Sequence, residues 1–322
     1  MTMSENDQRV LKALDRAREQ HPELAPLLDL HRDLYRVQFQ AKADLPEPEM
    51  PDDLAMRWRL NQQIGGGIPQ LTFERLRLEP EPFAALVAQV AQVLLRYNPD
   101  WQLDLEARTA DELADLARRI FETWDTLTGP KEQVGRSSDT LPGAEIPPAR
   151  AGSQSGAGAR TTVRAEQERA QQAFISGDSP EANPLTLTVA AALAPYLQRA
   201  AEAIRPHLDL SPWDQGYCPI CGGRPNFAVL DEETGARQLM CARCATLWTY
   251  SRLRCPFCGA GAEKATYYAS EDGFYRLYVC PTCKHYLKAV DLRKARRLVE
   301  PLVERLLTVG MDLTARQEGY ED

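Results

Sequence analysis

The chain has 322 residues, a formal net charge of −8 and a hydrophobic content of 43%. That length is enough for two domains, and no apolar run approaches the roughly 20 residues that cross a bilayer. The N-terminus, Met1 to Asp7, lacks the basic and then apolar order of a secretory signal peptide. We therefore expect a cytoplasmic protein with no membrane insertion, in which thiols stay reduced. The acidic balance also argues against nucleic-acid binding.

Residues 1–210 are predicted to form a helical domain. Ser4 can cap a first helix, and a second apolar stripe follows Pro22, a residue tolerated in a first helical turn. The proline-rich segment 45–51 is interpreted as a linker. The triple glycine in 62–69 is interpreted as a plain flexible loop, because it lacks the Lys-Ser/Thr of a phosphate-binding loop.

Three further helical signals follow in this region. Residues 82–97 have an amphipathic pattern, and Thr109 with Glu112 forms a capping box that opens the next helix. Residues 131–162 are rich in Gly, Ser, Pro and Arg and predict a flexible insert. Asn183 is then expected to cap a last long helix.

All eight cysteines lie in one stretch, as four C-x-x-C pairs. Two residues between the thiols let both sulfurs of a pair turn toward one ion, and one pair supplies half of a tetrahedral site. Four pairs therefore predict two sites. The glycine after the first and third pairs allows a backbone turn with positive φ. The candidate metal ligands are Cys218, Cys221, Cys241, Cys244, Cys255, Cys258, Cys280 and Cys283.

Between the pairs, each half of this stretch has the pattern of a β-hairpin around a glycine turn. Pairing first with second and third with fourth closes the shorter loops and matches this repeat, so we prefer it to crossed pairing. The predicted fold is α+β: a helical N-terminal domain, then a tandem rubredoxin-like or zinc-ribbon tetra-cysteine metal module, then a C-terminal helix. The expected boundaries are 1–210, 211–290 for the two metal-binding modules, and 291–322 for a helix beginning at Asp291 and a tail.

A site closed by four thiolates has no open coordination position, so it cannot activate a water molecule. The ions could then serve folding alone, or iron could exchange electrons as in rubredoxin, since an all-sulfur tetrahedron suits both iron and zinc. His285 follows the last cysteine but is not expected to be a ligand. The other histidines, His21, His31 and His207, are interpreted as surface or capping residues.

Two interaction surfaces can be weighed from the same region. The hairpins could present a docking face rich in aromatic and arginine residues, a composition that suits protein interfaces. Its candidate residues are Trp248, Tyr250, Arg252, Arg254, Tyr267, Tyr268, Tyr275 and Tyr278. Some of these rings must instead form the small core of the module. A nucleic-acid-binding ribbon is the weaker alternative, because its one basic cluster, Arg293 to Arg297, is more simply one solvated helix face. Residues 217–291 contain nine Lys and Arg and seven Asp and Glu. With eight thiolates and two divalent ions added, the net charge of the module would be about −2, whereas a nucleic-acid-binding ribbon normally has a basic face.

The cysteine pairs and their neighbours carry a specific family resemblance. They run from Cys218-Pro-Ile-Cys-Gly-Gly-Arg-Pro225, through Cys241-x-x-Cys244 with Trp248 and Arg254-Cys255-x-x-Cys258-Gly259, to Tyr275-Arg276, Cys280-x-x-Cys283 and Tyr286-Leu287-Lys288 with Asp291. In these motifs the chain resembles the formate dehydrogenase accessory protein family FdhE. The helical part with Gly67-Ile68-Pro69 is similar to that family in character.

The resemblance implies a cytoplasmic, non-enzymatic assembly factor that acts on the catalytic subunit of a respiratory formate dehydrogenase. It also implies rubredoxin-type iron at the eight cysteines, with zinc as the alternative for the two metal ions.

Overall fold

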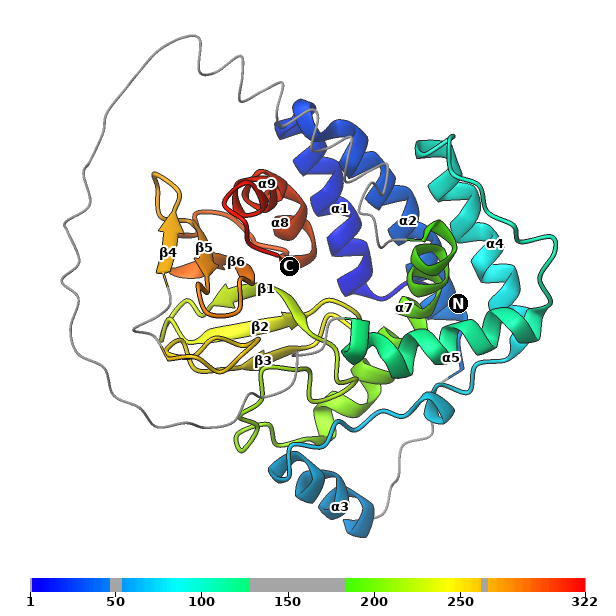
Figure 1. Ribbon diagram of the computed structural model, residues 1–322, viewed down its shortest axis with the longest axis horizontal. Coiled ribbons are helices and arrows are strands. Elements are labelled where there is room, and N and C mark those ends of the chain that lie inside the picture. Colours follow the sequence, from blue (N-terminus) through cyan, green and yellow to red (C-terminus); the bar gives the residue numbers. More distant parts are fainter. Residues whose placement is uncertain (1, 47–53, 128–182, 262–265, 322) are drawn as a thin grey trace.

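The computed structural model of the chain describes residues 2–46, 54–127, 183–261 and 266–321 (Figure 1). The predicted insert at 131–162 lies outside these residues, as does most of the predicted linker at 45–51. In the described part of the chain, residues before 210 form helices and residues 225–291 contribute the strands of a sheet.

The helices begin at the capping residues that the sequence predicts. The Ser4 side chain accepts a hydrogen bond from the Asp7 N–H (3.1 Å), and Asn183 accepts one from the Leu185 N–H (2.9 Å). Thr109 accepts from the Glu112 N–H while Glu112 accepts from the Thr109 N–H, which completes the capping box. None of the helices in the described ranges is long and apolar enough to span a bilayer. The N-terminal helices are α1 (Glu5–Gln20), α2 (Ala25–Asp44), α3 (Leu54–Gly65), α4 (Pro80–Tyr97), α5 (Ala110–Leu127) and α7 (Pro184–Ile204).

His31 corrects one interpretation from the sequence, because it is a buried residue of α2 and not a surface or capping one. It lies on the apolar side of the helix with Leu27 and Tyr35, and its Nδ1 is 2.9 Å from the Leu27 carbonyl oxygen. Burial lowers the pKa of His31 to about 4, so the ring is neutral at pH 7.

Six strands form one sheet in the order β3-β2-β1-β6-β5-β4. All neighbours are antiparallel except β1 and β6, which pair in parallel from Phe227↔Lys288 to Leu230↔Asp291. The two predicted hairpins, β1–β2 and β4–β5, are therefore joined through β6, which pairs in parallel with β1 and antiparallel with β5 (Figure 1). The strands are β1 (Pro225–Leu230), β2 (Arg237–Cys241), β3 (Leu247–Thr249), β4 (Thr266–Ala269), β5 (Tyr275–Val279) and β6 (Tyr286–Asp291).

The C-terminal helix begins later than expected. Asp291 is the last residue of β6, and helical structure resumes as α8 (Pro301–Leu307) and α9 (Val309–Gln317). Pro301 occupies the first turn of α8, where its missing N–H costs nothing, so the proline marks the helix start rather than a kink within it. Helix α8 packs against β1 and β6, and α9 packs against β5 and β6.

The basic cluster after Asp291 is consequently not one face of an α-helix. Arg293 pairs with Asp291, and Arg297 pairs with Glu304, a residue with only 1% of its surface exposed. These arginines hold the segment between β6 and α8 in place, so two of the four cations are engaged within the fold.

The main hydrophobic core is continuous from the helices into the first half of the sheet. Ile220 and Trp248 belong to the same buried cluster as Phe83 and Leu193. The opposite face of the sheet packs on α8 and α9 in smaller clusters, one with Phe227, Val229 and Val290 and another with Leu277 and Tyr286. The first four cysteines of the chain belong to the main core, whereas the buried Cys255 and Cys280 do not.

Candidate metal centres

The eight cysteines gather into two groups of four, in the sequence-adjacent pairing preferred above. In each group one sulfur atom per residue lies within 4.8 Å of all the others. All eight thiols are free of disulfides. The first group is Cys218, Cys221, Cys241 and Cys244; the second is Cys255, Cys258, Cys280 and Cys283.

The first group is assembled by the ends of β1, β2 and β3. The Cys221 Sγ lies 3.5 Å from both Cys241 Sγ and Cys244 Sγ, and the Cys218 Sγ lies 3.6 Å from Cys244 Sγ. Backbone N–H groups of Ile220 and Arg243 point at the sulfurs of Cys218 and Cys241, each at 3.4 Å. Such N–H groups stabilise negative charge on sulfur.

The second group repeats this construction with the ends of β4, β5 and β6. Its closest sulfur pairs, Cys255 with Cys283 and Cys258 with Cys280, are both 3.7 Å apart. The turns correspond as well, since Gly222 and Gly259 both have φ of 73°. In each group the first cysteine N–H donates to the carbonyl oxygen five residues on, Gly223 or Ala260, at 2.8 Å.

The sulfur spacing fits a tetrahedral ion. A metal–sulfur distance of about 2.3 Å gives sulfur–sulfur edges of about 3.8 Å in a tetrahedron. The five separations given above are 3.5 to 3.7 Å, and all sulfurs of a group lie within 4.8 Å of one another. A disulfide would instead need about 2.05 Å. Both groups could therefore hold a metal ion, and a donor set of four sulfurs suits iron or zinc.

Ionisation of the thiols is uneven within each group. Burial raises the pKa of Cys218 and Cys244 well above that of a free thiol, whereas hydrogen bonds from neighbouring thiols hold the pKa of Cys221 well below it. In the second group a hydrogen bond from Cys283 lowers the pKa of Cys255 to about 5, and burial raises the pKa of Cys258 to about 11. Without a cation, negative charge is thus concentrated on one sulfur, and four thiolates together require a metal ion.

The triple-glycine loop contacts the first group, a role that its sequence does not predict. The N–H groups of Gln70 and Leu71 donate to the carbonyl oxygens of Pro219 and Ile220, at 3.1 and 2.8 Å. The Tyr217 hydroxyl donates to the Gly67 carbonyl oxygen at 2.8 Å. These contacts are backbone hydrogen bonds, which any residue type can form, so the sequence of the loop does not reveal them. The family-like Gly67-Ile68-Pro69 is the one sequence feature that draws attention to this loop.

The proposed docking face is divided by the fold. Trp248 and Tyr250 are buried, at 2% and 4% exposure, and belong to the core. Tyr267 and Tyr268 on β4 are 52% and 55% exposed. The aromatic residues therefore do not form one surface, and the accessible ones lie at the β4 edge.

His285 lies beside the second group without joining it. Its Nδ1 is 2.9 Å from the Cys283 carbonyl oxygen, and its ring stacks on Phe257 at 4.8 Å between centroids. The ring is not among the groups whose ligand atoms gather in the described residues. Its contacts position the turn that carries Cys283.

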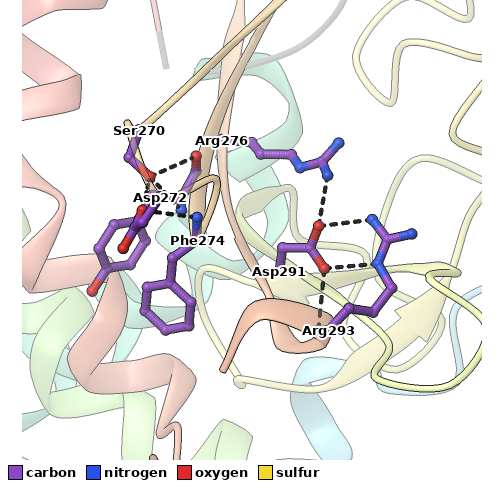
Figure 2. Close-up of polar contacts among 7 residues, drawn as sticks. Ser270, Asp272, Phe274, Arg276, Asp291 and Arg293 are labelled. Atoms are coloured by element: carbon purple, nitrogen blue, oxygen red, sulfur yellow. Dashed lines mark hydrogen bonds and ion pairs between the residues drawn. The ribbon is translucent and has the colours of Figure 1, made fainter. Parts of the chain in front are cut away.

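The motif residues at the end of the cysteine region hold the sheet together. Asp291, with no exposed surface, accepts hydrogen bonds from Arg276 (2.6 Å) and Arg293 (2.7 Å), as Figure 2 shows. Lys288 donates to Asp312 of α9 at 2.6 Å, and Tyr286 donates to the same carboxylate at 2.8 Å. These residues anchor β5, β6 and the C-terminal helices, which is a structural role.

Comparison with known proteins gives a consistent family. Residues 217–252 match the FdhE central domain. A relative described as "Protein FdhE homolog" from Aquifex aeolicus is 34% identical over 133 residues, which are 40% of this chain and 46% of the relative. One from Stutzerimonas stutzeri is 35% identical over 143 residues, 40% of this chain and 46% of the relative. The aligned part thus spans about half the length of these curated relatives.

A solved structure extends the similarity in fold. The crystal structure of the FdhE protein from Pseudomonas aeruginosa aligns with 99% of this chain and 94% of its own, at a TM-score of 0.54 and 18% identity. At that identity the match concerns the fold alone. The resemblance to the FdhE family is therefore confirmed, by sequence over the cysteine region and by fold over nearly the whole chain.

Proposed function

We propose that this chain is a cytoplasmic, non-enzymatic maturation factor for a respiratory formate dehydrogenase, and that it binds the catalytic subunit of that enzyme. The observation that carries the proposal is a pair of closed four-thiol groups built into one sheet, in a chain with the FdhE fold. Four sulfur ligands leave no coordination position for a substrate. An ion held there serves folding, docking or electron transfer, and not hydrolysis.

The eight cysteines are the proposed ligands of two metal ions, with iron favoured by the resemblance and zinc as the alternative. Elemental analysis of the full chain, purified without oxygen, should give two ions for each chain. Removal of the ions by a chelator should reduce the ordered structure seen by circular dichroism, because metal binding and folding are coupled in small metal-binding units. An ordered, metal-free protein would contradict this assignment.

The partner is tested with the purified catalytic subunit of the formate dehydrogenase from the same cell. The full chain should retain the subunit on an affinity column. A variant with Cys255→Ser and Cys258→Ser should lose it if the second metal unit forms part of the interface. The matched control is Glu106→Gln in the exposed turn before α5, which should bind as the wild type does. Loss of formate dehydrogenase activity in cells that lack this chain, restored by the wild-type gene, completes the test.

Rubredoxin-like electron transfer is the second candidate, and one observation favours it. Cys258 is exposed and Cys283 is partly exposed. An iron ion in the second group would therefore lie close enough to the surface to exchange electrons with a partner protein. Iron-loaded protein should then show a visible absorption that bleaches reversibly on reduction. Colourless protein with two zinc ions excludes this candidate.

A further inference from the structure

The two cysteine groups share the same backbone construction but differ in how far their cysteines are exposed to solvent. In the first group the exposed fractions are 0% for Cys218 and Cys241, 4% for Cys244 and 5% for Cys221. In the second group Cys255 and Cys280 are buried, whereas Cys283 is partly exposed and Cys258 is exposed. Equivalent positions therefore have unequal access to solvent.

The difference arises from what lies over the turns. A Cβ atom placed on Gly222 would be 3.4 Å from the Pro69 side chain, which belongs to the loop that clasps the first group. A Cβ placed on Gly259, at the same φ in the second group, meets no atom of the described residues within 4 Å. At this glycine the first turn is covered by the helical part of the chain, whereas among the described residues the second is uncovered on its Cys258–Gly259 side.

Charge differs at a second pair of equivalent positions. Arg243 lies between the cysteines of the C-x-x-C pair that ends the first group, and Thr282 holds that place in the second. The Arg243 guanidinium is buried against the ring of Phe121, at 4.8 Å from its centroid, and its side chain lies beside Gly223 of the first cysteine turn. Four thiolates and a divalent ion carry a net charge of −2, so a buried cation stabilises the loaded first group. Thr282 is exposed and has no charge to contribute.

We propose that the two groups have different tasks: the first holds a permanent structural ion, and the second is an exchange site for a thiophilic divalent cation. Its ion can leave or be replaced through the Cys258 side while the rest of the fold persists. This inference rests on the proposed assignment of the cysteines as metal ligands. Exchange needs an incoming ligand to reach the ion, and thiol reactivity follows exposure.

The persistence of the fold has its own structural basis. The strands of the second half are held by contacts that do not pass through its cysteines, chiefly the Asp291 ion pairs and the anchoring of Lys288 and Tyr286 on Asp312. The first group, in contrast, contributes Cys218, Cys221, Cys241 and Cys244 to the main hydrophobic core. Emptying the first group should disturb that core, and emptying the second should not.

The test uses the full chain loaded with two Zn²⁺ ions, their number verified by elemental analysis. The coloured chelator 4-(2-pyridylazo)resorcinol is added, and zinc transfer is followed by absorbance. One ion for each chain should transfer at least tenfold faster than the other, with the tryptophan fluorescence unchanged during the fast phase. Equal rates for the two ions would overturn the inference but leave the metal assignment intact. A chain that binds no zinc would contradict the proposed function itself.

Assignment of the fast ion uses matched variants at equivalent positions. Cys258→Ser should remove the fast phase and keep the slow one, whereas Cys221→Ser should keep the fast phase. Because Cys221 lies in the main core and its substitution can prevent folding, a second measurement uses the wild type. Brief labelling of the zinc-loaded protein with N-ethylmaleimide, followed by peptide mass spectrometry, should modify Cys258 and Cys283 at least tenfold faster than the four cysteines of the first group. Equal labelling of both groups would overturn the inference.

Discussion

The β3 end of the sheet is enclosed by the helical core, whereas the β4 end is open to solvent. Trp248 on β3 is 2% exposed and its indole N–H donates to the Gln215 carbonyl oxygen at 3.1 Å. All four residues of β4 are exposed. In the repeated unit of cysteine turn, hairpin and cysteine turn, β4 corresponds to β1, whose residues are all buried except the half-buried Asn226. The difference therefore lies in what packs against each unit. A repeated sequence pattern therefore predicts repeated local structure but not repeated burial.

The residue that follows each cysteine turn also differs with the packing around it. Gly223 follows the first cysteine turn, and a Cβ there would lie 2.7 Å from the Arg243 Cδ and 3.1 Å from the Cys241 Sγ. The equivalent residue of the second unit is Ala260. At this position the first unit, which is tightly packed, has no room for a Cβ atom, whereas the second unit accommodates the alanine side chain.

The largest expected effect separates the two ends of the sheet directly. Trp248→Ala should lower the free energy of unfolding by about 3–5 kcal/mol, because it leaves a cavity in the main core. Tyr268→Ala on β4 should change it by no more than about 0.5 kcal/mol, as an exposed substitution. Chemical denaturation followed by circular dichroism measures both. Equal losses would remove the contrast between the ends.

The centre of the sheet should be sensitive through its buried ion pairs. Asp291→Asn should lower the free energy of unfolding by about 3 kcal/mol, because Arg276 and Arg293 keep their charge beside a neutral partner. The control is Asp272→Asn at the exposed turn in the same view (Figure 2), where the carboxylate accepts from the Ser270 hydroxyl and the Phe274 N–H. The control variant should lower the free energy of unfolding by less than about 1 kcal/mol. If the control variant lost as much stability as Asp291→Asn, the buried ion pairs would not contribute more to stability than the exposed hydrogen bonds of the turn.

The glycine pair tests whether enclosure limits the first turn. Gly223→Ala should lower the free energy of unfolding by about 1–3 kcal/mol through overpacking against Arg243 and Cys241. The reciprocal change, Ala260→Gly, adds no atoms and should cost about 1 kcal/mol or less. Thermal or chemical unfolding of the metal-loaded variants measures the difference. If Gly223→Ala is tolerated as well as Ala260→Gly, the first turn is not sterically restricted.

The helical side of the molecule should show a pH dependence that comes from His31. Its pKa is about 4 in the folded protein and near 6.5 when unfolded, so the unfolded chain binds a proton that the folded one does not. Stability is then retained above pH 6.5 and is lost as the pH falls toward 4, by about 2 kcal/mol at pH 5.

Comparison of unfolding at pH 7 and pH 5 isolates this contribution. His31→Gln should reduce the loss between the two pH values, whereas His21→Gln, at a partly exposed helix end, should keep it. An unchanged pH dependence in His31→Gln would mean that other groups account for the loss.

Much of the local structure follows from the sequence for identifiable reasons. Ser4, Thr109 with Glu112, and Asn183 cap helices because their side-chain oxygens satisfy free N–H groups of the first turn. The glycine turns and hairpins of the cysteine region also follow local rules. Two equivalent turns, however, place Ala245 and Lys284 at positive φ, at 59° and 62°. Neither residue type signals that conformation.

The sequence by itself determined that four thiol pairs form two sites, because the two-residue spacing and the short intervening hairpins bring adjacent pairs together. Only the tertiary structure decided that β6 joins the two hairpins through its parallel pairing with β1. It also decided that the triple-glycine loop packs on the first group and that Cys258 and Cys283 of the second group stay accessible. Spacing and turn chemistry act over a few residues and leave a readable pattern. Burial depends on contacts between segments more than a hundred residues apart, many of them through backbone atoms that every residue shares.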